Sequence, residues 1–373
     1  MSKIAELDQL PFHYIILKII SLCNLACDYC HAGNLPTRPA LMPIHLISRI
    51  LNDFSSSSDR DQLQLVFHGG EPLLAGLTFF KKILALEAQI KTSNIRITHG
   101  IQTNGTLITN EWIDLFQEGQ FKVGLSIDGP PALHDKHRKD KTGQPTFDRV
   151  ATAIDKLQEN RIPISLLSVI TKESPLHVAP FFDLLLEWKI LGIDFLPCVG
   201  PTAHKHVHAY SKFMNAAFDI WLGHDMPFQV RTFLAILRSL KGENAGVCQF
   251  TKTCGKVLAI DALGRIYPCD RYIGDENYLI GEVTSSSIEL VDSPPIILEK
   301  KMPSSCTTCE VNQVCNNGCP ARVDPKSGRD IFCSARKEII QHIQARLEEH
   351  GLSPTDILGK FDQKSFQWTD SIT

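Results

Sequence analysis

The residues of this sequence with the clearest capacity for chemistry are its 12 cysteines. Three of them lie within Cys23–Cys30, and eight more lie between Cys248 and Cys333. The remaining one, Cys198, stands alone. In a chain of this size without the marks of secretion, cysteines grouped in this way indicate metal or redox chemistry rather than disulfide bonds.

The first group, Cys23, Cys27 and Cys30, supplies three thiolates from one short loop. A 4Fe–4S cluster usually takes four cysteine ligands, so three would leave one iron open, as a catalytic metal centre requires. A zinc site, with His31 as a further ligand, or a redox pair is the alternative. Spacing alone leaves these interpretations open.

The elements that must position this loop are predicted by alternating apolar runs and helical patterns, which are typical of βα units around a parallel sheet. The expected strands are Tyr14–Ile20, Leu63–Phe67, Ile95–Gln102, Lys122–Ile127, Ile164–Ile170 and Ile193–Pro197. The expected helices between them include Pro43–Phe54, Leu77–Ile90, Glu111–Glu118, Phe147–Glu159 and Pro180–Trp188. Six such units predict an α/β fold that closes into a partial (β/α)6 barrel.

Ligand sites in such sheets gather at the carboxyl ends of the strands. The cysteine loop follows the first expected strand, and three further polar motifs, His68–Pro72, Thr103–Gly105 and Asp128–Pro130, follow the next three. The sequence therefore predicts that these motifs and the cysteine loop form one site.

The alternation stops near Gly200, and a helical region, His208–Leu240, leads into the cysteine-rich segment. That segment contains an expected β-hairpin, Val257–Ile260 with Arg265–Pro268, and a helix over Ser334–His350. We therefore expect a barrel with linking helices over residues 1–240, a cysteine-rich domain over 241–350 and a tail over 351–373.

Composition excludes several functional classes. The formal net charge of −3 gives no sign of a nucleic-acid or membrane-binding face, and no apolar run reaches the length of a membrane helix. The first residues lack the layout of a signal peptide, which makes the cytoplasm the expected location.

The two ordered motifs, Cys-Asn-Leu-Ala-Cys-Asp-Tyr-Cys after the first strand and Gly-Gly-Glu-Pro after the second, resemble the radical S-adenosylmethionine (SAM) superfamily. The resemblance implies a catalytic 4Fe–4S cluster on Cys23, Cys27 and Cys30, with SAM bound at the open iron and cleaved to a radical that removes a hydrogen atom from the substrate. It further implies SAM contacts near the strand ends, with Tyr29 beside the adenine, Gly69 and Gly70 leaving room for close approach, and Glu71 accepting from the ammonium group. Ser126 and Arg138 match positions that contact the ribose and carboxylate of SAM, and Asn104 would lie near the ribose or carboxylate. Turn or strand-end hydrogen bonds are the alternative for each.

The later cysteines resemble the SPASM domain, a C-terminal extension of radical SAM enzymes that modify peptides and proteins. By similarity to anaerobic sulfatase-maturing enzymes, the resemblance implies two auxiliary 4Fe–4S clusters. One would be held by Cys248, Cys254, Cys269 and Cys319, and the other by Cys306, Cys309, Cys315 and Cys333. Structural zinc sites are the alternative.

Asp270 directly follows Cys269, and in the sulfatase-maturing enzymes an aspartate at this position acts as the base that deprotonates the substrate. An ion pair with Arg271 is the alternative role. A histidine-rich loop, His204–His208, is a weaker candidate for the substrate cavity, and we assign no role to His68. Cys198 is expected to be a buried apolar residue.

Our leading hypothesis is a maturase that installs a cross-link, of the cyclophane carbon–carbon type, in a ribosomal precursor peptide. The residue after the third cysteine is His31, where sulfatase-maturing enzymes tend to carry an aromatic residue. The alternatives are an anaerobic sulfatase-maturing enzyme that forms formylglycine from Cys or Ser, and a non-catalytic iron–sulfur electron carrier. The expected partners are a peptide or protein substrate and an electron donor such as flavodoxin or ferredoxin. The short segment before Cys23 leaves no room for the leader-binding domain found in many peptide maturases.

Overall fold

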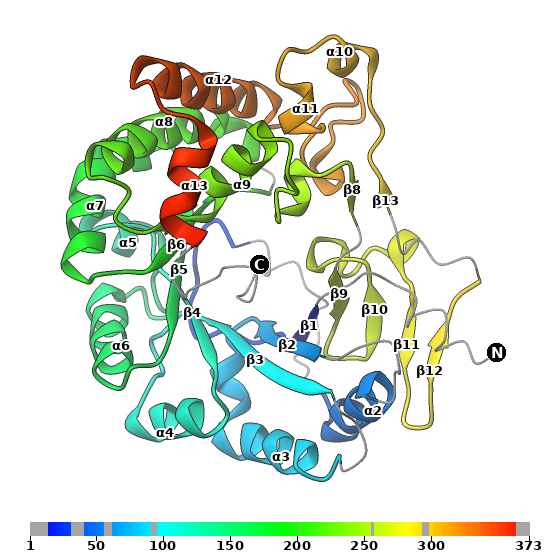
Figure 1. The fold of residues 1–373 in the computed structure, drawn as a ribbon. Coiled ribbons are helices and arrows are strands. Elements are labelled where there is room, and N and C mark those ends of the chain that lie inside the picture. The colour runs from blue at the N-terminus through cyan, green and yellow to red at the C-terminus, as the bar shows by residue number, and fades with distance from the viewer. Residues whose placement is uncertain are drawn as a thin grey trace.

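The computed structural model describes residues 14–30, 41–55, 62–90, 95–200, 202–254, 257–292 and 298–362. Its centre is a curved sheet whose first strands are those that the sequence predicts, with ends that differ by at most two residues. These strands are β1 (Tyr14–Ile20), β2 (Gln62–Gly69), β3 (Arg96–Thr103), β4 (Lys122–Ser126), β5 (Ile164–Ile170) and β6 (Gly192–Pro197). They pair in sequence order and in parallel, which confirms the α/β radical SAM type of fold (Figure 1).

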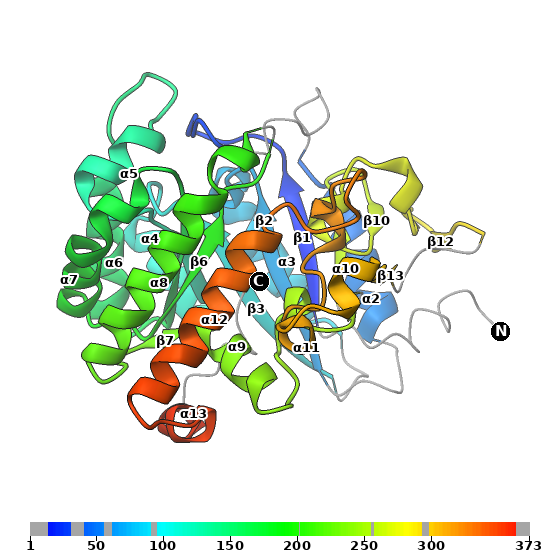
Figure 2. The same ribbon diagram turned by 90° about the horizontal axis from the view of Figure 1, so that it is seen from above.

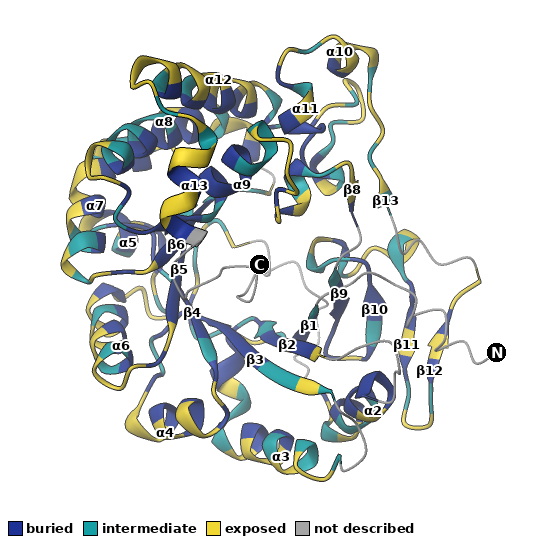
Figure 3. Cartoon of the chain, in the orientation of Figure 1, coloured by how far each residue is buried: buried dark blue, intermediate teal, exposed yellow. Residues whose placement is uncertain are grey.

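Helices cover the outer face of this sheet, as the crossovers between parallel strands require. They are α2 (Ile44–Ser55), α3 (Leu77–Glu87), α4 (Asn110–Glu118), α6 (Phe147–Glu159), α7 (Val178–Glu187) and α8 (Val207–Gly223). A short helix, α5 (Pro131–His137), lies at the mouth of the barrel and was not predicted. The strands are largely buried, and exposed residues gather on the outer sides of the helices (Figure 3).

The two faces of β1 differ, because successive side chains of a strand point to opposite sides. Leu17 and Ile19 belong to the large core between sheet and helices. Ile16 instead packs with Val66 of β2 and Ala259 in a small separate cluster on the inner face. Lys18 shares the face of Ile16, so a cation points to the inside of the barrel.

Most strands of the cysteine-rich segment continue the same sheet, and β8 (Thr253–Cys254) and β13 (Leu298–Glu299) form a separate two-stranded sheet. The predicted hairpin is confirmed as β9 (Val257–Ile260) and β10 (Arg265–Tyr267), and β9 pairs in parallel with β1. Two further strands, β11 (Gly281–Val283) and β12 (Ile288–Leu290), extend this edge. β7 (Gln229–Val230) forms the opposite edge, beside β6. The cysteine-rich segment therefore lies against β1, the strand that leads into Cys23.

Two C-terminal helices pack back on the barrel side. The predicted helix is confirmed as α12 (Cys333–Glu349), which packs against α8, and α13 (Pro354–Asp362) packs against α9 (Arg231–Leu240) (Figure 2). The expectation of a tail from residue 351 was wrong for α13, because Ile357, Leu358 and Phe361 are buried. Residues 363–373 lie outside the described residues.

Candidate active site

The Gly-Gly-Glu motif holds the backbone that leads into the first cysteine loop. The amide of Gly70 donates to the carbonyl of Ile20 at 2.8 Å, and the amide of Glu71 donates to that of Leu22 at 2.8 Å. A Cβ atom at Gly69 or Gly70 would lie 2.1 Å from these carbonyl oxygens, and Gly69 has a φ of +142°. This close backbone approach by itself requires glycine at both positions, and their contact with SAM stays a prediction.

Glu71 is fully buried and already accepts three protein donors. Its carboxylate receives the amide of Leu73 at 3.0 Å, the hydroxyl of Thr103 at 2.7 Å and the amide of Asn104 at 2.8 Å. Burial raises the pKa of Glu71 to about 7, although these bonds act in the opposite direction. Glu71 thus links the end of β2 to the end of β3, and a carboxylate can accept a further donor beyond these three.

Asn104 connects the same strand end to the cysteine loop. Its Nδ2 donates to Oδ1 of Asn24 at 2.9 Å and lies 3.8 Å from Sγ of Cys23. Its Oδ1 accepts the amide of Thr106 at 3.0 Å. Asn104 is therefore beside a candidate cluster ligand, as the strand-end argument predicts.

The thiols of Cys23, Cys27 and Cys30 lie near one another. Burial raises the pKa of Cys27 to about 12, and the charges of Cys30 and Cys23 act in the same direction. Cys30 is exposed, and the other two thiols are half-buried. His31, the alternative zinc ligand, lies outside the described residues.

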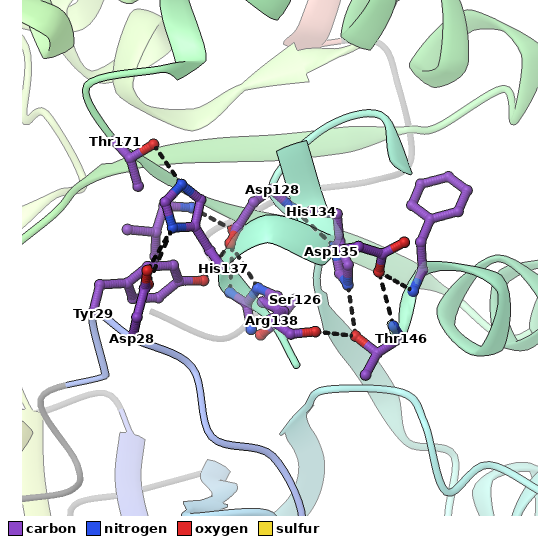
Figure 4. Close-up of polar contacts among 12 residues, drawn as sticks. Asp28, Tyr29, Ser126, Asp128, His134, Asp135, His137, Arg138, Thr146 and Thr171 are labelled. Carbon is purple, nitrogen blue, oxygen red and sulfur yellow. Dashed lines mark hydrogen bonds and ion pairs between the residues drawn. The ribbon is translucent and has the colours of Figure 1, made fainter. Parts of the chain in front are cut away.

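Arg138 ends α5, and it lies against Asp128 and Tyr29 (Figure 4). Its Nε donates to Oδ2 of Asp128 at 2.8 Å, and its Nη2 donates to Oδ1 at 3.2 Å. The Tyr29 hydroxyl donates to the same carboxylate, and the guanidinium carbon lies 5.5 Å from the centre of the Tyr29 ring. Burial alone would raise the pKa of Asp128, but the charge of Arg138 lowers it below its usual value.

Ser126 lies at the end of β4 and accepts a hydrogen bond from Nε2 of Gln102 at 3.0 Å. Gln102 is buried, and its Oε1 has no hydrogen-bond partner within the part of the chain that the structure describes. The sequence analysis missed Gln102, which reads as an ordinary strand residue. Its alternation with Ile101, a core residue, was the available signal that Gln102 faces inward.

The later cysteines gather in the two groups that the resemblance implies. The charges of Cys248, Cys269 and Cys319 all raise the pKa of Cys254, so these four thiols lie together. A hydrogen bond from Cys254 lowers the pKa of Cys248 to about 6, and Lys300 contributes to this shift.

The second group is Cys306, Cys309, Cys315 and Cys333. The charges of the other three raise the pKa of Cys306, and all four line one cavity of about 290 Å³. Arg336 of α12 donates to Sγ of Cys315 at 3.4 Å and to its carbonyl oxygen at 3.0 Å. Among the described residues, no three His, Cys, Asp or Glu side chains converge as closely as the ligands of a single metal ion. A four-iron cluster spaces its ligands more widely than one ion does.

Asp270 lies between the cysteine-rich segment and the barrel interior. Its Oδ2 lies 3.6 Å from Nζ of Lys18, whose side chain is 5% exposed, and its Oδ1 accepts from Sγ of Cys269 at 3.3 Å. Burial alone would raise the pKa of Asp270, but the charges of Lys18 and Arg271 lower it well below its usual value. The sequence analysis considered Arg271 as its partner and missed Lys18, although a lysine inside the apolar run of β1 was a visible signal.

The weaker candidates lie at the rim or in the core. His206 follows β6, and its Nδ1 is buried without a hydrogen-bond partner in the described residues. Cys198 is 1% exposed, which agrees with the expected buried apolar role. His68 pairs in register with Lys18 and accepts the Gly69 amide at 2.7 Å. No helix formed by the described residues is long and apolar enough to span a membrane.

Comparisons with known proteins agree with this geometry. The model of the radical SAM superfamily matches residues 17–185. A serine-type anaerobic sulfatase-maturating enzyme of Klebsiella aerogenes is 30% identical over 91% of this chain and 87% of its own length. A cysteine-type anaerobic sulfatase-maturating enzyme of Clostridium perfringens is 27% identical over 90% of this chain and 97% of its own length.

Solved structures give the same result. The structure described as native anSMEcpe with bound AdoMet and Cp18Cys peptide aligns with a TM-score of 0.81 and 27% identity, covering 92% of this chain and 99% of that one. A Streptococcus suis SuiB structure bound to S-adenosylmethionine, 17% identical with a TM-score of 0.62, shares the fold. The chain therefore belongs to the radical SAM superfamily, as a homologue of the anaerobic sulfatase-maturating enzymes that modifies a peptide or protein.

Proposed function

We propose that this chain oxidises a Cys or Ser residue of a protein or peptide substrate to formylglycine. The observation that carries the proposal is similarity to both the serine-type and the cysteine-type maturating enzymes over about nine-tenths of the chain. The position of Asp270 supports it, because this carboxylate ion-pairs with Lys18 on the inner face of the barrel. The cyclophane cross-link that the sequence analysis favoured becomes the second candidate.

The residues present suit the implied cofactors. Three half-buried or exposed thiols suit a cluster with one open iron, and each later group of four thiols suits a fully ligated cluster. SAM would be held near Asn104, Ser126 and Arg138, with Tyr29 and the Gly69–Glu71 turn beside it. When bound, these groups supply the radical that removes a hydrogen atom from the substrate and accept the electron that the substrate then loses.

Asp270 would take the substrate proton. Removing a hydrogen atom from the β-carbon, a proton from the thiol or hydroxyl and one electron converts a serine directly to the aldehyde. A cysteine gives the thioaldehyde, which water hydrolyses to the aldehyde with release of hydrogen sulfide. The ion pair with Lys18 holds the carboxylate of Asp270 ionised and therefore able to accept a proton.

We also propose a functional division of the chain near residue 240. Residues 1–240 would generate the radical, and residues 241–350 would hold the auxiliary clusters and Asp270. The pairing of β9 with β1 brings the two parts into one sheet, so electron and proton acceptors approach the barrel mouth together. A reduced flavodoxin or ferredoxin would supply the electron for SAM cleavage.

The experiment uses the full chain reconstituted anaerobically with iron and sulfide, which should give about 12 irons if three clusters form. Peptides that differ only in carrying Cys, Ser or Ala at one position are incubated with SAM and a reductant. We expect an aldehyde, trapped by a hydrazide and located by mass spectrometry, in the Cys or Ser peptide and none in the Ala peptide. A product that has lost two hydrogens without reacting with the hydrazide would replace formylglycine by the cross-link.

The second candidate rests on one specific observation. The residue after Cys30 is His31, where sulfatase-maturing enzymes tend to carry an aromatic residue, and it lies outside the described residues. In a cross-linking reaction the side-chain radical would add to an aromatic ring, which then loses a proton and an electron. A peptide with an aromatic residue near the Ala position tests this reaction in the same assay.

A further inference from the structure

A buried carboxylate at the end of β4 joins three parts of the barrel mouth. Asp128 is 1% exposed, and its two oxygens accept four donors from three segments, two of them from Arg138 (Figure 4). Oδ2 accepts Nε of Arg138 at 2.8 Å and the Tyr29 hydroxyl, and Oδ1 accepts Nη2 of Arg138 at 3.2 Å and the amide of Val169 at 2.9 Å. Burying a carboxylate costs free energy unless hydrogen bonds compensate it. The four hydrogen bonds to Asp128 therefore indicate a fixed and specific arrangement.

The geometry of the pair decides which edge of the arginine is available. A guanidinium has five N–H donors, and Asp128 takes the Nε–H and one Nη2–H. The three remaining N–H groups include both Nη atoms, which form the end of the fork. Asp128 therefore occupies the Nε side of the guanidinium. The end formed by the two Nη atoms stays available to a second carboxylate.

The tyrosine links this pair to the cluster loop. Tyr29 lies between Cys27 and Cys30, and its hydroxyl donates to Asp128 while its ring lies beside the guanidinium of Arg138. The same loop makes a second hydrogen bond, to α5, in which Asp28 accepts from Nδ1 of His137 at 2.9 Å. The position of the loop and the direction of the arginine are thus set by one carboxylate and one helix, α5.

We propose that Asp128 is a positioning residue for SAM. Asp128 orients the free end of the Arg138 guanidinium toward the SAM carboxylate, and through the Tyr29 hydroxyl it fixes this guanidinium relative to the cluster loop. The inference rests on the proposed function in one respect, the SAM contact of Arg138. It goes beyond it by assigning a role to a residue that does not touch the cofactor and by giving the Tyr29 hydroxyl a task separate from its ring.

The first test is Asp128→Asn in the reconstituted chain, with SAM affinity measured by anaerobic titration calorimetry without substrate. All four donors point at the two oxygens, so an amide NH2 placed in either position faces donors and cannot restore the arrangement. We expect SAM to bind at least about tenfold more weakly. If Asp128 only competes with SAM for Arg138, the variant frees the guanidinium and binds SAM more tightly, which would overturn the proposal.

Tyr29→Phe is the milder variant and keeps the ring for adenine contact. Losing one hydrogen bond to a buried carboxylate should weaken SAM binding about threefold. In the Asp128→Asn background the same change should have almost no further effect, because its partner is already altered. Equal effects of Tyr29→Phe in both backgrounds would show that the hydroxyl acts elsewhere and would remove it from the proposal.

Asp194→Asn is the matched control. Asp194 is also 1% exposed, lies in β6 and accepts the hydroxyl of Thr232 at 2.7 Å, but in the described chain its hydrogen bonds do not reach the cluster loop. SAM affinity should change less than about twofold there. A loss equal to that of Asp128→Asn would mean that any buried acid has this effect, and the proposal would fail.

Spectroscopy provides a readout that does not depend on turnover. SAM addition should change the electron paramagnetic resonance signal of the reduced catalytic cluster in the wild type, and Asp128→Asn should need more SAM for the same change. Iron content is measured in each sample to show equal loading. A wild-type protein that does not bind SAM would overturn the proposed function itself, whereas equal affinities of wild type and Asp128→Asn would overturn only this inference.

Discussion

The loop of Cys23, Cys27 and Cys30 and the later cysteine groups present thiols in different surroundings. The first loop offers three half-buried or exposed thiols beside Asn104 and the Asp128–Arg138 ion pair, which together carry no net charge. Each later group offers four thiols, most of them buried or half-buried, with cations close by.

The cations in the later groups are named by their contacts. Lys300 donates to the carbonyl of Cys248 at 2.9 Å, Arg336 donates to Sγ of Cys315, and the charges of Cys319 and Cys269 raise the pKa of Arg271. Cations beside four thiolates offset the negative charge of a fully ligated cluster and help to set its potential. The partners of the first loop carry no net charge, which suits a zwitterionic ligand such as SAM. The comparison indicates that the number of cysteines at a site and the charge of the side chains around it change together along this chain.

The largest expected effect separates the two kinds of site. Cys27→Ala should abolish 5′-deoxyadenosine formation, because the catalytic cluster loses a ligand beside its open iron. Cys315→Ala should keep SAM cleavage and lose modified peptide, because only an electron acceptor is damaged. Chromatography of 5′-deoxyadenosine and mass spectrometry of the peptide measure the two outputs. Equal loss of SAM cleavage in both variants would remove the functional difference between the groups.

The next effect lies where the two regions meet. Asp270→Asn should lower modified peptide at least about hundredfold, within the usual contribution of a general base, and should spare SAM cleavage. The matched control is Asp275→Asn, an exposed residue of the same segment that caps a short helical turn. Modified peptide at the wild-type level in Asp270→Asn would exclude it as the base.

Lys18→Met tests the partner of that base with a smaller effect. The methionine fills a similar space, but Asp270 loses the cation that lies 3.6 Å away, and we expect modified peptide to fall about tenfold. Because Lys18 lowers the pKa of Asp270, its removal should move the acid limb of the pH profile to higher pH. Lys18→Arg should return much of the lost product. An unchanged acid limb would show that Lys18 has only a packing role.

Much of this fold could be predicted because its signals are local. Most β-strands of the barrel contain a short apolar run, and β1 and β5 have the predicted ends. The helix α13 was missed because its apolar residues are few and become buried only against α9. Its packing is a long-range contact that periodicity does not reveal.

The functional site likewise has parts that the sequence predicted and parts that it did not. The family resemblance, not the cysteine spacing alone, implied which thiols gather, since Cys254 and Cys319 are far apart in the sequence and meet only in the fold. Lys18 was missed as a site residue, because it meets Asp270 only through β9–β1 pairing. Asp128 was predicted at the strand ends, but its ion pair with Arg138 was missed because it depends on the turn of α5. A backbone reason for Gly69 and Gly70 was also missed, because the sequence does not show that the backbone at Ile20 and Leu22 lies so close.

The smallest expected effect concerns how stability depends on pH in the barrel, the region that contains the first cysteine loop. His134 of α5 is fully buried, and its Nε2 donates to the Thr146 hydroxyl at 3.0 Å, since that hydroxyl itself donates to the carbonyl of Arg138. Its Nδ1 can then accept the Asp128 amide at 3.4 Å, so the folded chain favours a neutral ring. Burial lowers the pKa of His134 from 6.5 to about 4, and the charge of Arg138 acts in the same direction.

As the pH falls below 6.5, the unfolded chain takes up this proton before the folded chain does, so stability is lost on the acid side. Between about pH 7 and about pH 6, His134 should account for a loss of somewhat less than about 1 kcal/mol. His134→Gln removes the titrating ring, so the variant should be less stable at neutral pH but should show a flatter dependence over this range. Chemical unfolding of the reconstituted chain under anaerobic conditions measures both. A dependence as steep in the variant as in the wild type would show that groups other than His134 set the acid sensitivity.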